Sequence, residues 1–250
     1  MKSTFFFSDV HLGLEDTAQE KAKERRLLSF LDHVAEHGER LYIMGDLFDY
    51  WFEYKYVIPR GYHHVLSRLA TLAEKGIEVR YVAGNHDFWL KDFFPQDLGI
   101  PVFTDPFGTE IHGKRFYLHH GDGLALKDTG YRILKKVLRS PVSIFFFSLL
   151  HPDITAPLAR GSSRTSRQYT GHKDYGETDG MVQFADAKIT EGFDFVVMGH
   201  RHVPLSHPSG GGLYVNLGDW ITYNTYAEFD GTSLVLKEWT TAPKGGTDHG

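Results

Sequence analysis

The chain reads VRYVAGNHD over residues 79–87, and this stretch decides the fold. An apolar run with strand character ends at Ala83, and four polar or small residues follow it directly. Residues 41–46, LYIMGD, repeat the arrangement, as do residues 4–9, TFFFSD. Because stretches with helical spacing separate these runs, they indicate βαβ units and a parallel sheet. Their polar ends should then meet at the carboxyl edge of that sheet, where open α/β sheets hold their sites.

Helices and further strands follow from spacing and turn residues. A first helix should carry apolar residues 27, 28, 31, 34 and 35 and stop at Gly38, and a second should cover about 61–75, with Gly76 as its cap. Short strands are expected at 195–198, 213–216, 226–229 and 234–238, with hairpin turns at 111–114 and 229–232. Two sheets packed face to face with helices outside account for both halves. The predicted fold is therefore a four-layer α-β-β-α sandwich.

One domain over residues 1–240 is expected, with an insertion at about 124–178 that covers the site as a helical lid. There the rhythm of strands and helices breaks, and an apolar run, IFFFSLL, occupies residues 144–150. Basic residues surround this run on both sides. Residues 241–250 are polar and rich in glycine, so we expect a flexible tail.

The bulk composition excludes several classes of protein. A length of 250 residues and a hydrophobic content of 41% can fill a sizeable core. The formal net charge of −5 argues against nucleic-acid binding by the whole surface. The absence of cysteine excludes disulfides and thiolate metal sites. No signal peptide and no apolar run near the ~20 residues of a membrane span is visible, so a cytoplasmic protein is the default expectation. The sequence does not indicate an oligomeric state.

Six short motifs after apolar runs supply metal-ligand side chains: Asp9-Val10-His11, Gly45-Asp46, Gly84-Asn85-His86-Asp87, His120-Gly121-Asp122, Gly199-His200-Arg201-His202 and Asn216-Leu217-Gly218-Asp219. Taken singly, each has a structural reading, such as a surface turn, a helix N-cap or a buried histidine. Their joint occurrence at successive strand ends favours a common site. Ligands of His, Asp and Asn without thiolate favour Mn, Fe or Zn in a hydrolytic two-metal site.

Local spacing suggests how some of these side chains are aimed. Strand alternation would point Asp9 and His11 to the same side, and would let only one of His119 and His120 face the site. His86 can donate a proton or contact a phosphoryl oxygen, and Asp87 can hold its ring in one tautomer. His86 and Asp87 are therefore the expected catalytic residues.

The ordered motifs resemble those of the calcineurin-like metallophosphoesterase family, and the resemblance covers nearly the whole chain. The family pattern is D-x-H, G-D-x-x-D/E, G-N-H-D/E, a histidine and G-H-x-H, and Asp49 fills the last place of the second element. The resemblance implies one cation held by Asp9, His11, Asp46 and His202, and a second held by Asp46, Asn85, His120 and His200. Mn²⁺ is the expected metal, with Fe or Zn as alternatives.

A finer resemblance is to the branch of this family that hydrolyses UDP-2,3-diacylglucosamine in lipid A biosynthesis. It is carried by SDVHLG at 8–13, GDLFD at 45–49 with Trp51, GNHDF at 84–88, HGDGL at 120–124 with Asp128 and Tyr131, and LGDW at 217–220. It implies an amphiphilic nucleotide-sugar lipid substrate bound by Asn85, His86, Asp128, Tyr131, Arg160, Ser163, Arg164, Arg167 and His200.

That resemblance also implies products, a location and alternatives. Attack on the α-phosphorus would release UMP and 2,3-diacylglucosamine 1-phosphate, with the acyl chains under residues 144–150. An amphiphilic substrate implies peripheral contact with the cytoplasmic face of a Gram-negative inner membrane. The alternatives are a phosphoesterase for nucleotides, nucleic acid or phosphoproteins, and a non-catalytic scaffold of the same fold. The apolar lid residues could also simply pack two lid helices together.

Overall fold

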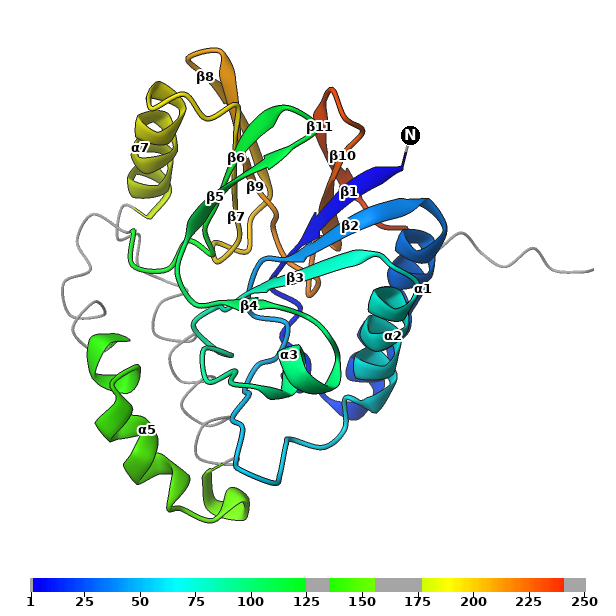
Figure 1. The fold of residues 1–250 in the computed structure, drawn as a ribbon, viewed down its shortest axis with the longest axis vertical. Helices are drawn as coiled ribbons and strands as arrows, with labels where there is room; N and C mark the ends of the chain where they lie inside the picture. Colours follow the sequence, from blue (N-terminus) through cyan, green and yellow to red (C-terminus); the bar gives the residue numbers. More distant parts are fainter. Residues whose placement is uncertain (1, 125–134, 156–176, 241–250) are drawn as a thin grey trace, which may run out of the picture.

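The structure is a computed structural model, and it describes residues 2–124, 135–155 and 177–240. Two β-sheets lie face to face, with α1 and α2 covering one outer face and α7 the other (Figure 1). The predicted four-layer sandwich is thus confirmed. The proposed flexible tail at 241–250 lies outside the described residues. In the described part of the chain, no helix combines the length and apolarity that a membrane span requires.

The first sheet has the order β11-β10-β1-β2-β3-β4. Parallel pairing joins β1 (Ser3–Phe7), β2 (Gly38–Ile43), β3 (Glu78–Val82) and β4 (Val102–Phe103), while β10 (Thr225–Phe229) pairs antiparallel with β1 and with β11 (Leu234–Glu238). The carboxyl ends of β1, β2 and β3 therefore meet at one edge.

The second sheet has the order β5-β6-β7-β9-β8. Its central strands β6 (Lys114–Leu118), β7 (Phe195–Met198) and β9 (Gly212–Asn216) are parallel, and β5 (Phe107–Ile111) and β8 (Leu205–Ser209) flank them antiparallel. The predicted hairpin turns at 111–114 and 229–232 join β5 to β6 and β10 to β11. The carboxyl ends of β6, β7 and β9 form a second edge beside the first.

The helices bury one stripe each against the sheets. Helix α1 (Thr17–His37) begins at Asp16, whose carboxylate accepts hydrogen bonds from the N–H groups of Ala18 and Gln19, both 3.0 Å long. It ends at Gly38, as predicted. Its buried residues pack with those of α2 (His63–Glu74) on the first sheet, and α3 (Phe93–Asp97) closes the lower end of that layer. Helix α7 (Glu177–Thr190) packs on the second sheet.

Strand β1 shows how alternation builds the layers. Phe5 and Phe7 face the helices, whereas Phe6 faces the second sheet and stacks on Phe116, with ring centroids 5.6 Å apart. All three side chains are fully buried. Burial of a phenyl group is worth about 1.5–3 kcal/mol, so this register is strongly fixed. That register sets where the strand ends and Asp9 begins.

A separate helix, α5 (Pro141–Ser148), lies apart from the sandwich, near the edge where the strands end (Figure 1). Ser140 caps it by accepting a hydrogen bond from Ser143 N at 3.2 Å. Phe147 is turned inward and contacts Trp89 and Phe52, at centroid distances of 4.5 and 4.9 Å. The full extent of the insertion at about 124–178 stays a prediction, because only residues 124, 135–155 and 177–178 of it are described.

Candidate metal centre

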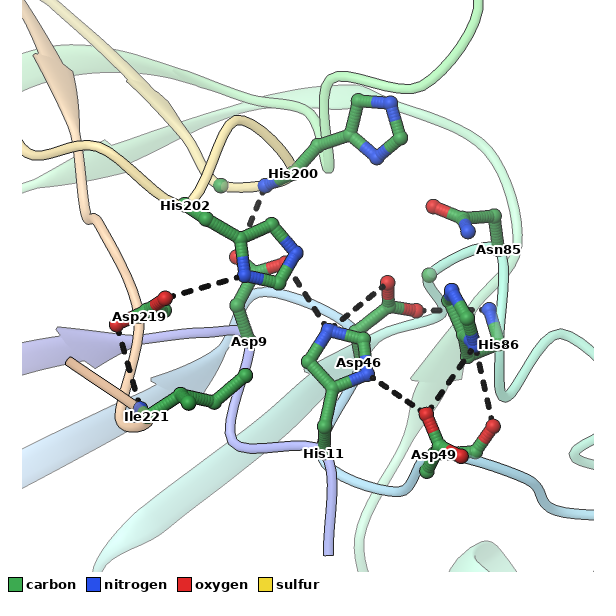
Figure 2. A network of polar contacts seen from close by, with 12 residues as sticks. Asp9, His11, Asp46, Asp49, Asn85, His86, His200, His202, Asp219 and Ile221 are labelled. Atoms are coloured by element: carbon green, nitrogen blue, oxygen red, sulfur yellow. Dashed lines mark hydrogen bonds and ion pairs between the residues drawn. The ribbon is translucent and has the colours of Figure 1, made fainter. Parts of the chain in front are cut away.

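The carboxyl ends of five strands bring the predicted ligands to one place, and a sixth strand adds Asp219 beside them (Figure 2). Each strand contributes from the residues directly after it: Asp9 and His11 after β1, Asp46 after β2, Asn85 and His86 after β3, His120 after β6, His200 and His202 after β7, and Asp219 after β9. The loops are joined to each other, since Asp9 N donates to Gly45 O at 3.1 Å and His11 N to Asp46 O at 3.0 Å. The site is therefore built at the edge that the sequence indicated.

Backbone conformation, not strand alternation, aims these side chains. Asp9, His11 and Asp46 have φ angles of 54°, 49° and 54°, and His200 and His202 have 69° and 61°. These values lie in the left-handed region, which costs non-glycine residues energy and is concentrated at functional sites. The expectation that alternation places Asp9 and His11 on one side was right in outcome but wrong in mechanism. The left-handed backbone of the loops after β1, β2 and β7 does the aiming.

One group of ligand atoms surrounds Asp9. Its Oδ1 lies 3.8 Å from His11 Nε2 and 3.6 Å from His202 Nε2. Ligand atoms of Asp9, His11 and His202 all lie within 4.8 Å of one another. Two ligands of a single cation at metal–ligand distances near 2.1 Å are separated by about 3–4 Å. These are three of the four side chains of the first predicted ligand set, and the fourth is Asp46.

A second group contains Asp46, which also lies beside His11 of the first group. Asp46 Oδ2 lies 3.8 Å from His11 Nε2 and 3.3 Å from His120 Nε2, and His120 Nε2 lies 3.1 Å from Asn85 Oδ1. Ligand atoms of Asp46, His120 and His200 also lie within 4.8 Å of one another, and so do those of Asp46, His11 and His86. Asp46 stands between both groups, which is the position of a bridging carboxylate.

Further hydrogen bonds orient the imidazole rings. His120 Nδ1 is 2.8 Å from Met44 O, so it donates to that carbonyl and leaves Nε2 as the metal-facing atom. His202 Nδ1 is 3.3 Å from Asp219 Oδ2, and Asp219 Oδ1 accepts from three backbone N–H groups at 2.8–3.2 Å. His11 Nδ1 lies 3.4 Å from Asp49 Oδ1.

Asp49 and Asp219 were not among the predicted site residues, although both belong to motifs that the sequence displays. Their motif positions were the available signal, because a carboxylate often holds the second nitrogen of a metal-binding imidazole.

The hypothesis that Asp87 holds the His86 ring was wrong. Asp87 is fully buried and accepts hydrogen bonds from Gly84 N at 2.8 Å, from Leu47 N at 2.9 Å and from the Tyr81 hydroxyl. His86 Nδ1 instead faces Asp49, 3.1 Å from its carbonyl oxygen.

Burial, followed by the charge of Asp46, raises the pKa of Asp87 to about 6. Because Asp87 accepts hydrogen bonds from Leu47 N and Gly84 N, it joins the loops after β2 and β3 and positions them.

Only one of the adjacent residues His119 and His120 faces the site, as predicted. His120 enters the site, and His119 Nδ1 accepts a hydrogen bond of 2.6 Å from Gly121 N. Burial lowers the pKa of His119 to about 4, so its ring is neutral.

The ligand set carries strong mutual electrostatics. Burial lowers the pKa of His120, but the charge of Asp46 outweighs it and raises that pKa to about 10. Burial also lowers the pKa of His11, but the neighbouring carboxylates of Asp49 and Asp9 outweigh it and raise that pKa to about 9. Despite burial, the charge of His120 holds the pKa of Asp46 well below its usual range. Buried carboxylates need cationic partners, and divalent cations can supply that charge in place of protons.

Two independent observations fit a pair of divalent cations. Asp9 Oδ1 is buried and has no hydrogen-bond partner among the residues that the structure describes. The loops also approach so closely that a Cβ on Gly84 would collide with Asp46 Oδ1, and a Cβ on Gly199 with Asp9 Oδ2. Nitrogen and oxygen donors without sulfur suit Mn, Fe or Zn.

The predicted substrate contacts divide into two groups. Asn85, His86 and His200 lie at the metal centre. Asp128, Tyr131, Arg160, Ser163, Arg164 and Arg167 lie outside the described residues.

The described part of the insertion is tied to the site by Asp122, a member of the His120-Gly121-Asp122 motif to which the sequence had assigned no role of its own. Its Oδ2 pairs with Lys135 at 2.7 Å and with Arg139 at 3.5 Å, and Arg139 also donates to Gly84 O at 3.0 Å.

Comparison with known proteins agrees with this geometry. The calcineurin-like phosphoesterase family model matches residues 3–204, and this chain belongs to that family. A UDP-2,3-diacylglucosamine hydrolase of Porphyromonas gingivalis is 38% identical over 95% of this chain and 98% of its own length. Proteins of the same name from Nitrosococcus oceani and Hahella chejuensis are 30% and 29% identical, over 82% and 93% of this chain and 80% and 96% of theirs.

Proposed function

We propose that this protein hydrolyses the pyrophosphate bond of UDP-2,3-diacylglucosamine at the α-phosphorus, giving UMP and 2,3-diacylglucosamine 1-phosphate. The observation that carries the proposal is the convergence of seven side chains from five strand ends, with Asp46 Oδ2 lying 3.8 Å from His11 Nε2 and 3.3 Å from His120 Nε2. The names of the similar proteins supply the substrate. Mn²⁺ is the expected metal.

Two bound divalent cations supply an activated water and stabilise negative charge on phosphorus. The chain's own residues hold and orient the reactants. Asp49 fixes the ring of His86, whose side chain is 18% exposed and lies beside Asp46 at the centre of the site. His86 is thus suited to contact a phosphoryl oxygen of the substrate and to stabilise its developing charge. Asn85, beside His120, offers a second polar contact.

We assign the acyl chains of the substrate to α5. Val142, Phe145, Phe146 and Leu149 are 65%, 59%, 63% and 66% exposed, an unusual cluster for so short a helix. Phe147 anchors the helix to Trp89 beside the metal centre. Acyl chains could therefore lie on α5 while the pyrophosphate reaches the cations. The same apolar surface supports peripheral association with the cytoplasmic face of the inner membrane.

Metal removal and restoration test the reaction. Protein treated with a chelator should not hydrolyse UDP-2,3-diacylglucosamine, and Mn²⁺ should restore release of UMP, followed by chromatography. If the restored enzyme cleaves only water-soluble phosphodiesters, the lipid substrate is wrong while the two-metal chemistry stands. If metal never confers hydrolysis and the Asp46→Ala variant keeps a protein partner, the chain is a scaffold.

Replacement of exposed α5 residues tests the acyl assignment. Phe145→Gln with Phe146→Gln should raise KM for the acylated substrate roughly tenfold or more, since each buried phenyl group is worth about 1.5–3 kcal/mol. KM for a small chromogenic phosphodiester should not change. Val235→Gln, at an exposed position on β11, is the matched control. Equal effects on both substrates would mean that these residues only pack the lid.

A further inference from the structure

A cavity of about 610 Å³, lined by both charged and apolar residues, lies beside the metal centre. It is enclosed by the end of β3, the connection between β4 and β5, the end of β6 and the segment 135–139. Its volume falls within the range of small-molecule sites, roughly 300–1,000 Å³. Neither the predicted ligands nor the predicted substrate contacts, apart from His120, line it.

His120 connects this cavity to the metal centre. It lines the cavity, and its Nε2 lies 3.3 Å from Asp46 Oδ2 and 3.1 Å from Asn85 Oδ1. The cavity and the metal centre are therefore neighbours that share His120. A substrate bound at the metal centre can therefore extend toward the cavity or toward the lid segment.

The charges around the cavity favour an anionic and polar guest. Lys135, Lys136 and Arg139 line it, against the carboxylates of Asp105 and Asp122. Asp122 holds Lys135 and Arg139 in place at 2.7 and 3.5 Å, and their side chains are only 25% and 24% exposed. Lys136 has no ion-pair partner among the described residues, so its charge is available to a ligand.

The apolar surface of the lid segment lies further along the chain, on α5. Phe145, Phe146 and Leu149 are exposed there and do not line the cavity. The described lid segment therefore offers a charged end at 135–139 and an apolar end at 142–149. An amphiphile held at the metals would place its two halves on these two surfaces.

We propose that the cavity binds the nucleotide half of the substrate, and this inference rests on the proposed function. After cleavage, that half is a pyrimidine nucleoside 5′-monophosphate. Lys136 contacts the phosphate or ribose of this group, and Lys135 and Arg139 form the fixed cationic wall. The acylated sugar lies on the other side of the cations, toward α5. UMP is thus the product that leaves through the cavity.

Calorimetric titration of the Mn²⁺-loaded enzyme with UMP tests this assignment. Lys136→Met should weaken UMP binding roughly tenfold, the effect of losing one charge-assisted hydrogen bond. Lys75→Met, at an exposed lysine after α2, is the matched control and should bind UMP like the wild type. Thr104→Trp, at an exposed position on the cavity rim, should also weaken UMP binding by filling the space without removing charge.

Glucosamine 1-phosphate serves as the second probe, because it represents the other half of the substrate. Its affinity should be the same in the wild type, Lys136→Met and Thr104→Trp. The proposal is overturned if wild-type enzyme does not bind UMP, if both cavity variants bind UMP normally, or if they lose glucosamine 1-phosphate instead. Failure of the proposed function would appear separately, as wild-type enzyme that does not hydrolyse UDP-2,3-diacylglucosamine.

Discussion

Lys23→Met should destabilise the protein and loosen its metal centre. Lys23 is on α1 and fully buried, and its Nζ donates a hydrogen bond of 2.8 Å to the carbonyl of His11. Glu15 and Glu20 lie 3.2 and 3.3 Å from the same ammonium group. The lysine therefore fastens the turn that carries Asp9 and His11 to the helix layer.

The magnitude follows from these contacts. Methionine keeps most of the apolar stem, so the loss is chiefly that of the ammonium. A hydrogen bond from a charged donor contributes about 1.5–3 kcal/mol. Glu15 and Glu20 stay 17% and 22% exposed, so water can hydrate them after the change, and each pair adds less than about 1 kcal/mol. Relief from burying the ammonium offsets part of this sum. We expect a net loss of about 2 kcal/mol, or roughly 4–8 °C in Tm.

Urea titration of Lys23→Met and of Lys21→Met measures this loss. Lys21 is exposed on the same helix and is the matched control, for which little change is expected. Affinity for Mn²⁺ should fall in Lys23→Met alone, because the His11 carbonyl loses its anchor. If both variants unfold at the same urea concentration and bind Mn²⁺ equally, the buried ammonium has no such role.

Three further predictions concern the site and the sheet. Asp219→Asn should weaken Mn²⁺ binding about 10–100-fold, since it removes the carboxylate that orients His202, and equal affinity would contradict that role. Gly84→Ala should abolish binding of the metal pair, measured by calorimetry, because its Cβ collides with Asp46; retained binding would show that the loop can yield. Burial would raise the pKa of Glu228, but hydrogen bonds from a neighbouring lysine and serine lower it below 4.5. Glu228→Gln should therefore be less stable than wild type near neutral pH, and urea titrations should show this difference fading as the pH falls below 4.5; a constant difference would refute it.

Much of the fold could be predicted because its signals are local. The strands at 195–198 and 234–238 were predicted with the bounds that the structure gives, the first as a buried apolar run and the second as the strand that follows a hairpin turn. Strand β8 was missed, since LSHPS contains a proline and has weak alternation, which edge strands tolerate. Helix α7 was also missed, although Met181, Ala185 and Ile189 recur at a spacing of four and are buried.

The residues of the site could be predicted from the sequence, but the hydrogen bonds between them could not. Strand ends identify which residues can meet, so Asp9, Asp46 and His200 came together as expected. Hydrogen-bond partners depend on side-chain direction, which positive φ angles changed at these turns. Adjacency in the sequence likewise suggested that Asp87 holds the His86 ring, but Asp87 is directed to Gly84 N and Leu47 N, and Asp49 lies against that ring.

The number and position of bound metal ions test the central claim most directly. Crystals grown with Mn²⁺ and measured at its absorption edge should show two anomalous peaks per chain, about 3.5–4 Å apart. One peak should lie among Asp9, His11 and His202, the other among Asn85, His120 and His200, with Asp46 contacting both. A single ion, or two ions that do not share Asp46, would contradict the account.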